Sequence, residues 1–140
     1  MKRIVVLLFL ALFASTASNP ALADFNSGKK AYDRGDFAVA AKLWRQAGQA
    51  GDAKAQTNLG VLYASGRGVE KDAEKSVFWY RKAALAGYPK GQYNLGLMYR
   101  SGRGVEKDET AAAGWFRKAA KQGLASAHYM LGLAHRYGRG

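Results

Sequence analysis

The sequence predicts an all-α protein, a right-handed α-solenoid of stacked antiparallel helix pairs with about seven helices after an N-terminal leader. Three observations predict this fold. A 36-residue segment is repeated without a gap, apolar residues recur within it at helical spacing, and glycine and aspartate mark the ends of the helices. Units of this length cannot bury their apolar faces alone, so stacking must supply a continuous core.

The first residues have the layout of a secretory signal peptide. Met1–Arg3 is positively charged, Ile4–Phe13 is an unbroken apolar run, and Ala21–Ala23 provides an A-x-A cleavage site. The run is shorter than the roughly 20 residues that span a bilayer. The alternatives are a short membrane anchor or a buried helix. We expect a signal peptide over residues 1–23, cleavage after Ala23, and a repeat domain over 24–140 in the periplasm, with secretion as the second choice.

Composition restricts the partners of this chain. It has no cysteine, which excludes a lipidated lipoprotein and disulfide stapling, so packing of its 49% apolar residues must hold the fold. Its formal net charge is +12. Export argues against nucleic acid as the partner of this charge and leaves anionic envelope polymers, acidic protein surfaces and lipid head groups. The charge would also serve solubility alone.

The repeat organises the domain into four units. Gly51–Ala86 and Gly87–Gln122 align at an offset of 36 and share 20 of 36 residues. An upstream unit spans about 25–50, and a partial copy spans 123–140. This last copy stops before the Val and Asp of its loop, so either its helix caps the stack or the chain is part of a longer array. The octamer SGRGVEKD, at Ser65–Asp72 and again at Ser101–Asp108, is therefore interpreted as architecture before any binding role.

Each full unit is predicted to be a helical hairpin. The apolar residues of the first helix and of the second helix recur at helical spacing, and the sets in the first full copy are Ala55, Leu59, Leu62 and Tyr63, then Val77, Tyr80, Ala83 and Ala84. Aspartate opens the second helix and glycine closes both helices. The expected helices are 25–34, 36–48, 52–65, 72–86, 88–101, 108–122 and 124–137.

Within the octamer, Gly66 and Gly68 are expected to turn the chain, Val69 to be a buried plug and Asp72 to be a helix cap. Glycines also stand inside the first helices, at Gly60, Gly96 and Gly132, where each costs about 1 kcal/mol relative to alanine. Close approach of the partner helix, with Tyr63 or Trp79 filling the adjoining space, would offset this cost.

The pattern N-L-G-x-x-Y-x-S-G-x-G-V-x-x-D…W-[YF]-x-K-A-A-x-x-G, as it stands in both copies, resembles the Sel1-like repeat. The upstream Gly28-x-x-Ala31-Tyr32-x-x-Gly35-Asp36-Phe37 segment is similar to a tetratricopeptide unit with a short turn. Together the resemblance covers Phe25–Gly140. It implies a non-enzymatic α-solenoid adaptor that holds a partner protein, in exported bacterial members often an envelope enzyme or sensor. Cysteine-rich relatives have a disulfide in each unit, and this chain departs from that branch.

The resemblance also implies where a partner sits, because the first helix of each hairpin lines the concave face. The wider lining positions include Thr57, Val61, Leu97 and Leu133. Tyrosine and arginine are enriched among interface anchors, and an acidic, extended peptide would suit a groove that becomes aromatic and basic toward its C-terminal end. Some of these tyrosines would instead be ordinary core between repeats. The residues expected to contact a partner are Tyr32, Lys90, Tyr93, Arg100, Tyr129, Arg136 and Tyr137.

A second basic set lies in the loops. Stacking would place it along one edge, where it would suit an anionic glycan or a membrane surface. We call this set the basic loop ladder: Arg67, Lys71, Arg103, Lys107 and Arg139. Duplication of the unit would also produce such a row without any function. The main functional prediction is therefore an exported adaptor for a protein or peptide, and the alternative is an envelope protein that binds anionic glycan or lipid. The sequence makes no prediction of the oligomeric state.

No catalytic, metal or cofactor site is expected. His128 and His135 are seven residues apart on one helix, too far for shared ligation without a third group. Their repeat counterparts explain them, since His135 stands where Tyr63 and Tyr99 stand and is expected to be a packing residue. The acidic residues Glu70 and Asp72 flank Lys71 and should stay ionised. The octamer lacks the spacing of a phosphate-binding loop.

Overall fold

The computed structural model of the chain describes residues 23–138. Residues 1–22 of the predicted signal peptide therefore lie outside the described residues, and only Ala23 of it lies within them. Arg139 of the basic loop ladder also lies outside the described residues. The described residues form seven α-helices and no strand. The helices are α1 (Phe25–Asp33), α2 (Phe37–Gln49), α3 (Ala53–Ser65), α4 (Ala73–Leu85), α5 (Pro89–Ser101), α6 (Glu109–Lys121) and α7 (Ala125–Arg136).

The helix ends agree with the predicted ranges to within one residue, because those ranges included capping residues. The Asp72 carboxylate accepts a hydrogen bond from the Lys75 backbone N–H at 3.0 Å, and Asp108 caps α6 in the same way. Gly66 ends α3 in the left-handed conformation, with φ of 69°. At the start of α1 the backbone N–H of Ser27 donates to Asp24, and this bond lowers the pKa of that carboxyl.

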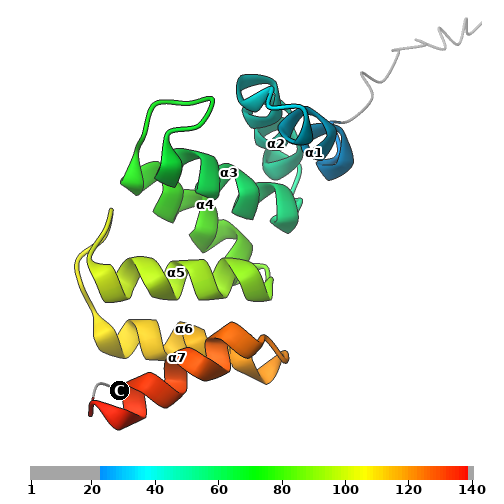
Figure 1. Ribbon diagram of the computed structural model, residues 1–140. Coiled ribbons are helices and arrows are strands. Elements are labelled where there is room, and N and C mark those ends of the chain that lie inside the picture. The colour runs from blue at the N-terminus through cyan, green and yellow to red at the C-terminus, as the bar shows by residue number, and fades with distance from the viewer. Residues whose placement is uncertain (1–22, 139–140) are drawn as a thin grey trace, which may run out of the picture.

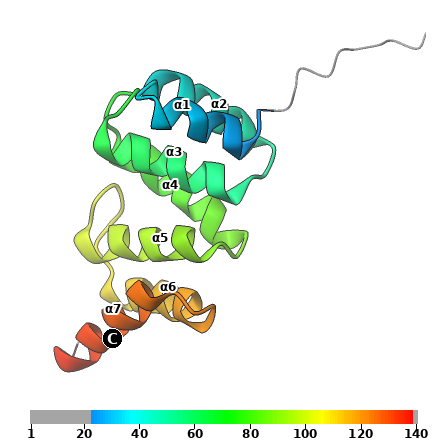
Figure 2. The same cartoon turned by 45° about the vertical axis from the view of Figure 1, so that its right-hand side comes forward.

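The helices stack as hairpins along one direction, as Figures 1 and 2 show. We call the side formed by α1, α3, α5 and α7 the first-helix face, and the side formed by α2, α4 and α6 the second-helix face. The first helices of neighbouring units approach each other more closely than the second helices do, α1 to α3 and α3 to α5. The first-helix face is therefore the inner side of the stack at these junctions. Helices α5 and α7 do not approach each other in this way.

Both predicted apolar stripes are buried, from Ala55, Leu59 and Leu62 in α3 to Val77 and Ala84 in α4. The expectation that Tyr63 or Trp79 fills the space beside the helix glycines is wrong. A Cβ on Gly60 would lie 2.6 Å from the Tyr80 ring, and one on Gly96 would lie 2.7 Å from the Phe116 ring. In the first unit, Trp44 occupies the equivalent place against Gly28, whereas a Cβ on Gly132 would meet nothing within 4 Å.

The octamer is structural, as expected. A Cβ on Gly68 would collide with the Phe37 backbone, and one on Gly104 would collide with the Ala73 backbone. Each loop thus packs against the first turn of the second helix of the preceding unit. Val69 is partly buried against the first core cluster, and Val105 is partly buried against the next one. Positive φ and backbone contact together explain why glycine stands at the fourth position of the octamer.

Two more contacts join neighbouring units. Arg45 donates a hydrogen bond to the Tyr63 hydroxyl at 2.9 Å, and Arg81 donates to that of Tyr99 at 3.1 Å. The expectation that His135, the next residue in this series, is a packing residue is wrong. It is exposed on α7.

Candidate functional site

Two hollows on the first-helix face of the described structure lie at positions predicted to contact a partner. Another, of about 430 Å³, lies at the starts of α1, α3 and α5, among Phe25, Lys54 and Tyr88. The N-terminal hollow, between α1 and α3, has a volume of about 240 Å³. The C-terminal hollow, between α5, α6 and α7, has a volume of about 150 Å³. Each is floored by the aromatic residue that packs against a helix glycine, Trp44 in the first case and Phe116 in the second. The repeated packing of the fold thus positions both hollows.

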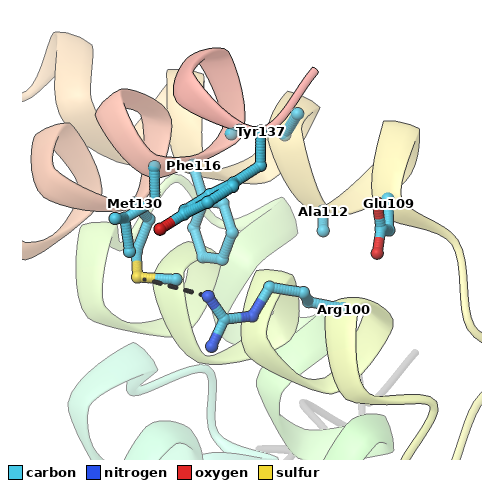
Figure 3. A pocket seen from close by; sticks show the side chains of 9 residues that line it. Arg100, Glu109, Ala112, Phe116, Met130 and Tyr137 are labelled. Carbon is cyan, nitrogen blue, oxygen red and sulfur yellow. Dashed lines mark hydrogen bonds between the residues drawn. The ribbon is translucent and has the colours of Figure 1, made fainter. Parts of the chain in front are cut away.

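The C-terminal hollow has an apolar floor and polar side chains at its edge (Figure 3). Its lining residues come from three helices and are Arg100, Glu109, Ala112, Ala113, Phe116, Met130, Leu133, Ala134 and Tyr137. Among them, Arg100 and Tyr137 were predicted from the sequence to contact a partner, and the fold brings these two together. Tyr137 is 62% exposed. One guanidinium N–H of Arg100 points toward the Met130 sulfur, 3.6 Å away.

Charged groups at the two hollows differ in their partners. At the N-terminal hollow, Lys29 and Asp33 form an ion pair at 2.6 Å, so its two charges neutralise each other. Among the described residues, no carboxylate lies within ion-pair distance of Arg100 at the C-terminal hollow. Glu109, on the same hollow, is paired with Lys107 at 3.5 Å. The C-terminal hollow therefore carries a cation that is available to a ligand.

The other predicted partner residues are placed differently. Tyr32 is half-buried, with its ring 5.6 Å from that of Trp44 in the same unit, and its hydroxyl accepts a hydrogen bond from Arg67 of the next unit. Tyr93 is half-buried against Phe116, with ring centroids 5.7 Å apart. Tyr129, its counterpart one unit later, is 67% exposed on α7. The remaining two, Lys90 on α5 and Arg136 on α7, are exposed. Of the wider lining positions, Thr57 is buried and faces no groove.

The basic loop ladder is partly engaged within the chain. Arg67 donates a hydrogen bond to the Tyr32 hydroxyl at 3.2 Å and lies over the Phe37 ring at 5.6 Å. Lys107 pairs with Glu109. Lys71 and Arg103 are exposed, although the charge of Arg103 is near enough to Tyr80 to oppose the rise that burial causes in the pKa of that phenol. Arg67 therefore acts as a joint between the first two units.

The second-helix face carries an apolar feature that the sequence analysis missed. Phe78 is 51% exposed and Leu85 is 73% exposed, and they lie two turns apart on one side of α4. Lys82 stands between them in the sequence. Its ammonium lies over the Phe78 ring, 5.3 Å from the ring centre, and partly covers it. Isolated exposed apolar residues of this kind are common on protein surfaces.

The described residues contain no group of three or more potential metal ligands. None of the described helices has the length and apolar character needed to cross a membrane.

The sequence analysis also missed the floor of the C-terminal hollow, formed by Ala112, Phe116 and Met130. A signal for it was present. Several lining residues of the hollow differ from the equivalent residues one unit earlier. Ala113 and Ala134 are smaller than Val77 and Met98, and Ala112 is less polar than Ser76. Comparing side-chain volumes between units, and not only identities, would have pointed to this place.

Comparisons with known proteins agree with this architecture. The family model described as Sel1 repeat matches four consecutive segments, residues 23–52, 53–88, 89–124 and 125–140. It thus includes the short-turned first unit as well as the two long-looped ones. Among the curated proteins compared, none matches the chain.

Several solved structures are similar. A Sel1 repeat protein from Oxalobacter formigenes is 35% identical with a TM-score of 0.77, over 82% of this chain and 47% of that one. The protein c5321, a protective antigen of uropathogenic Escherichia coli strains with an SLR fold, is 34% identical with a TM-score of 0.74, over 82% of this chain and 27% of that one. Helicobacter pylori cysteine rich protein B shares the fold at 23% identity and a TM-score of 0.63, over 76% of this chain and 96% of that one. The chain spans less than half the length of the first two.

Proposed function

The chain belongs to the Sel1 repeat family, whose members generally mediate protein–protein interactions and are typically non-enzymatic scaffolds, and from this we propose that it is an exported adaptor. In this proposal its first-helix face holds a segment of a partner protein of the cell envelope. The face is preorganised by helix packing, which limits the entropy lost when an extended segment binds.

The observation that carries this proposal is the pair of hollows on the first-helix face. Both are lined by residues whose positions in the repeat predicted them to contact a partner, such as Val61 in the N-terminal hollow and Arg100 in the C-terminal one. Concave, mainly apolar surfaces with a few polar groups are the usual form of binding sites. Of the described residues of the second-helix helices, Trp44 of α2 lines the N-terminal hollow, and Glu109, Ala112, Ala113 and Phe116 of α6 line the C-terminal one.

Export is supported by the N-terminal sequence and by the place where the helical domain begins. Cleavage after Ala23 would leave Asp24 as the cap of α1, whose carboxylate accepts the Ser27 backbone N–H at 2.7 Å. No residue needed by the first helix would be removed. Mass spectrometry of the protein purified from the native host should give a mature chain that starts at Asp24, and a chain that retains residues 1–23 would contradict export by cleavage.

Cross-linking capture from envelope extract, with the mature chain as bait, tests the adaptor function. We expect one dominant partner, retained at high salt, that is lost from the double variant Arg100→Ala with Tyr137→Ala. The matched control is Lys82→Ala with Leu85→Ala, which changes a cation and an apolar residue on the second-helix face. Loss of the partner from the control and not from the first-helix variant would contradict the proposal.

Salt concentration separates this function from the alternative, binding of anionic glycan or lipid by the basic loop ladder. Polyanion binding weakens steeply as salt rises, whereas a groove that binds mainly through apolar contacts weakens modestly. The ion pair between Lys107 and Glu109, and the contacts that hold Arg67 against Tyr32 and Phe37, reduce the number of cations that can turn toward a polyanion. Heterogeneous anionic material that salt releases, and that binds regardless of Arg100 and Tyr137, would favour the alternative.

A further inference from the structure

We propose that the C-terminal hollow is an anchor site for one aromatic side chain of an extended peptide segment that carries a carboxylate next to that side chain, and that Arg100 pairs with this carboxylate. This inference rests on the proposed function, because it names the partner chemistry that the first-helix face recognises. It is based on a comparison between two units of the same chain. The residues that line the hollow differ from the equivalent residues one unit earlier.

One unit earlier, at the junction of α3, α4 and α5, larger side chains fill the same place. Val77 and Met98 are buried there, with 3% and 4% of their surfaces exposed. Their equivalents at the C-terminal hollow are Ala113 and Ala134. Two differences leave space at the C-terminal hollow. Helices α5 and α7 approach each other less closely than α3 and α5 do, and Ala113 and Ala134 do not fill the volume that Val77 and Met98 occupy, although Met130 is larger than its equivalent Asn94.

The floor of the hollow also lacks the hydroxyl groups that the equivalent floor one unit earlier carries. The earlier unit buries Ser76 and Tyr80, and burial raises the pKa of the Tyr80 phenol. Their equivalents are Ala112 and Phe116, which have no polar side-chain atom. An apolar guest therefore meets no hydroxyl that would lose its hydrogen bonds when it binds.

The mouth of the hollow changes in the opposite direction. Where the earlier unit has Ala64 and Ser101, the C-terminal hollow has Arg100 and Tyr137. Small neutral side chains are thus replaced by a cation and a phenol at the mouth, while the side chains at Ala112, Ala113 and Ala134 inside are smaller or less polar than their equivalents. In Figure 3, the side chains of Arg100 and Tyr137 both extend toward Met130, and Glu109 lies apart from the guanidinium.

Size and charge together define the guest. A cavity of about 150 Å³ accommodates one aromatic ring, since an engineered cavity of that volume in another protein binds benzene. The neighbouring cation selects a carboxylate, because Arg100 has no acidic partner among the described residues and Glu109 is held by Lys107. Arginine binds a carboxylate with two parallel N–H donors, which also fixes the direction of the segment.

Three dye-labelled pentapeptides with blocked ends test the inference by fluorescence anisotropy with the purified protein. They are Gly-Asp-Phe-Asp-Gly, Gly-Asn-Phe-Asn-Gly and Gly-Asp-Ala-Asp-Gly. Removing the ring should raise Kd at least tenfold, because burial of a Phe side chain is lost. Removing the carboxylates should raise Kd about two- to fivefold, the range of an exposed ion pair. Equal binding of all three peptides would overturn the inference, as would no binding of any of them.

The variants at positions 100, 113 and 134 restore residues that the repeat already uses one unit earlier, so they are compatible with the fold. Ala113→Val with Ala134→Met should weaken binding of the Asp-Phe-Asp peptide at least tenfold while leaving the melting temperature unchanged or higher. Arg100→Ala should weaken that peptide about two- to fivefold and leave the Asn-Phe-Asn peptide unchanged. Lys118→Ala, a cation of the second-helix face, is the control and should change neither. Unchanged binding by the filled variant would contradict the assignment of the site.

Two further outcomes separate the anchor site from the adaptor function. If the partner captured from envelope extract still binds the filled variant, the anchor assignment is wrong and the adaptor function stands. If 3-phenylpropionate binds the hollow and the Asp-Phe-Asp peptide does not, the site takes a small aromatic acid and the peptide assignment is overturned. Loss of both the peptide and the partner in the filled variant supports the two proposals together.

Discussion

At the scale of single residues, the fold depends on pairs of a glycine and an aromatic side chain. Gly28, Gly60 and Gly96 each stand under a ring, which lets the two helices of a unit approach closely. The ring is Trp44, Tyr80 and Phe116 in successive units. Two of these rings, Trp44 and Phe116, also form the floors of the N-terminal and C-terminal hollows. The contact that holds the two helices of a unit together therefore also forms the floor of the hollow beside it.

The substitution Gly96→Ala should therefore destabilise the protein by about 1–3 kcal/mol, because a Cβ would lie 2.7 Å from the Phe116 ring. Gly132→Ala, at the equivalent position of α7, should stabilise it by about 1 kcal/mol, since nothing lies within 4 Å and alanine has the better helix propensity. Urea unfolding of both variants checks the pair. Equal effects of the same sign would show that packing of the ring does not decide the outcome.

At the scale of elements, the long loops act as joints between units. Each loop is closed by a hydrogen bond, from the backbone N–H of Asp72 to the carbonyl of Tyr63 at 2.9 Å in the first case, and of Asp108 to Tyr99 in the second. The second glycine of each loop then contacts the first turn of α2 or α4. The charged octamer is thus a part of the unit interface, and its arginine serves the same contact in the case of Arg67.

Gly104→Ala is expected to cost more than Gly123→Ala. Both glycines have positive φ, 66° and 87°, and alanine there costs about 1–2 kcal/mol. Only Gly104 also contacts the Ala73 backbone, which adds about 1–3 kcal/mol of overpacking. Thermal unfolding measured by circular dichroism compares them. If the two variants lost equal stability, the loop would not be a joint with α4.

The all-α fold, the order of the helices and their caps could be predicted from the sequence. The spacing of apolar residues and the aspartate and glycine residues at helix ends indicate local structure. The neighbours of each residue across a unit could not be predicted. Repeat alignment shows that Tyr63 and Tyr99 are equivalent, yet it does not show that Tyr80 faces Gly60. Nor does it distinguish Tyr93, half-buried against Phe116, from the exposed Tyr129. For the C-terminal hollow, the repeat alignment contains the changes to Ala112, Ala113 and Ala134, but only the structure shows that these residues line one space.

At the scale of the whole molecule, burial is uneven along the stack. Helix α4 buries six residues, among them Trp79 and Tyr80, whereas α7 buries only Ala127 and Met130 among its described side chains. In stacked repeats stability is a sum of unit and interface contributions, so a helix with fewer buried contacts opens at lower free energy. The wall of the C-terminal hollow formed by α7 is thus the part of the site that opens most readily.

Hydrogen exchange should therefore be faster for the backbone amides of α7 than for those of α4. A peptide that binds the C-terminal hollow should slow exchange in α7 and leave α4 nearly unchanged, because only α7, α5 and α6 line that hollow. Mass spectrometry of the exchanged protein measures both. Equal protection of α7 and α4 in the free protein would contradict this account of where stability lies.

The central claim, that the first-helix face holds the partner, is tested most directly by photo-cross-linking in the native host. A photoreactive amino acid is placed at Val61 or Tyr137 on the first-helix face, and at Val39 or Leu85 on the second-helix face. All four side chains are exposed, from 39% to 73%. We expect one discrete protein adduct from Val61 and Tyr137 and none from Val39 and Leu85. Adducts that form only from Val39 and Leu85 would contradict it.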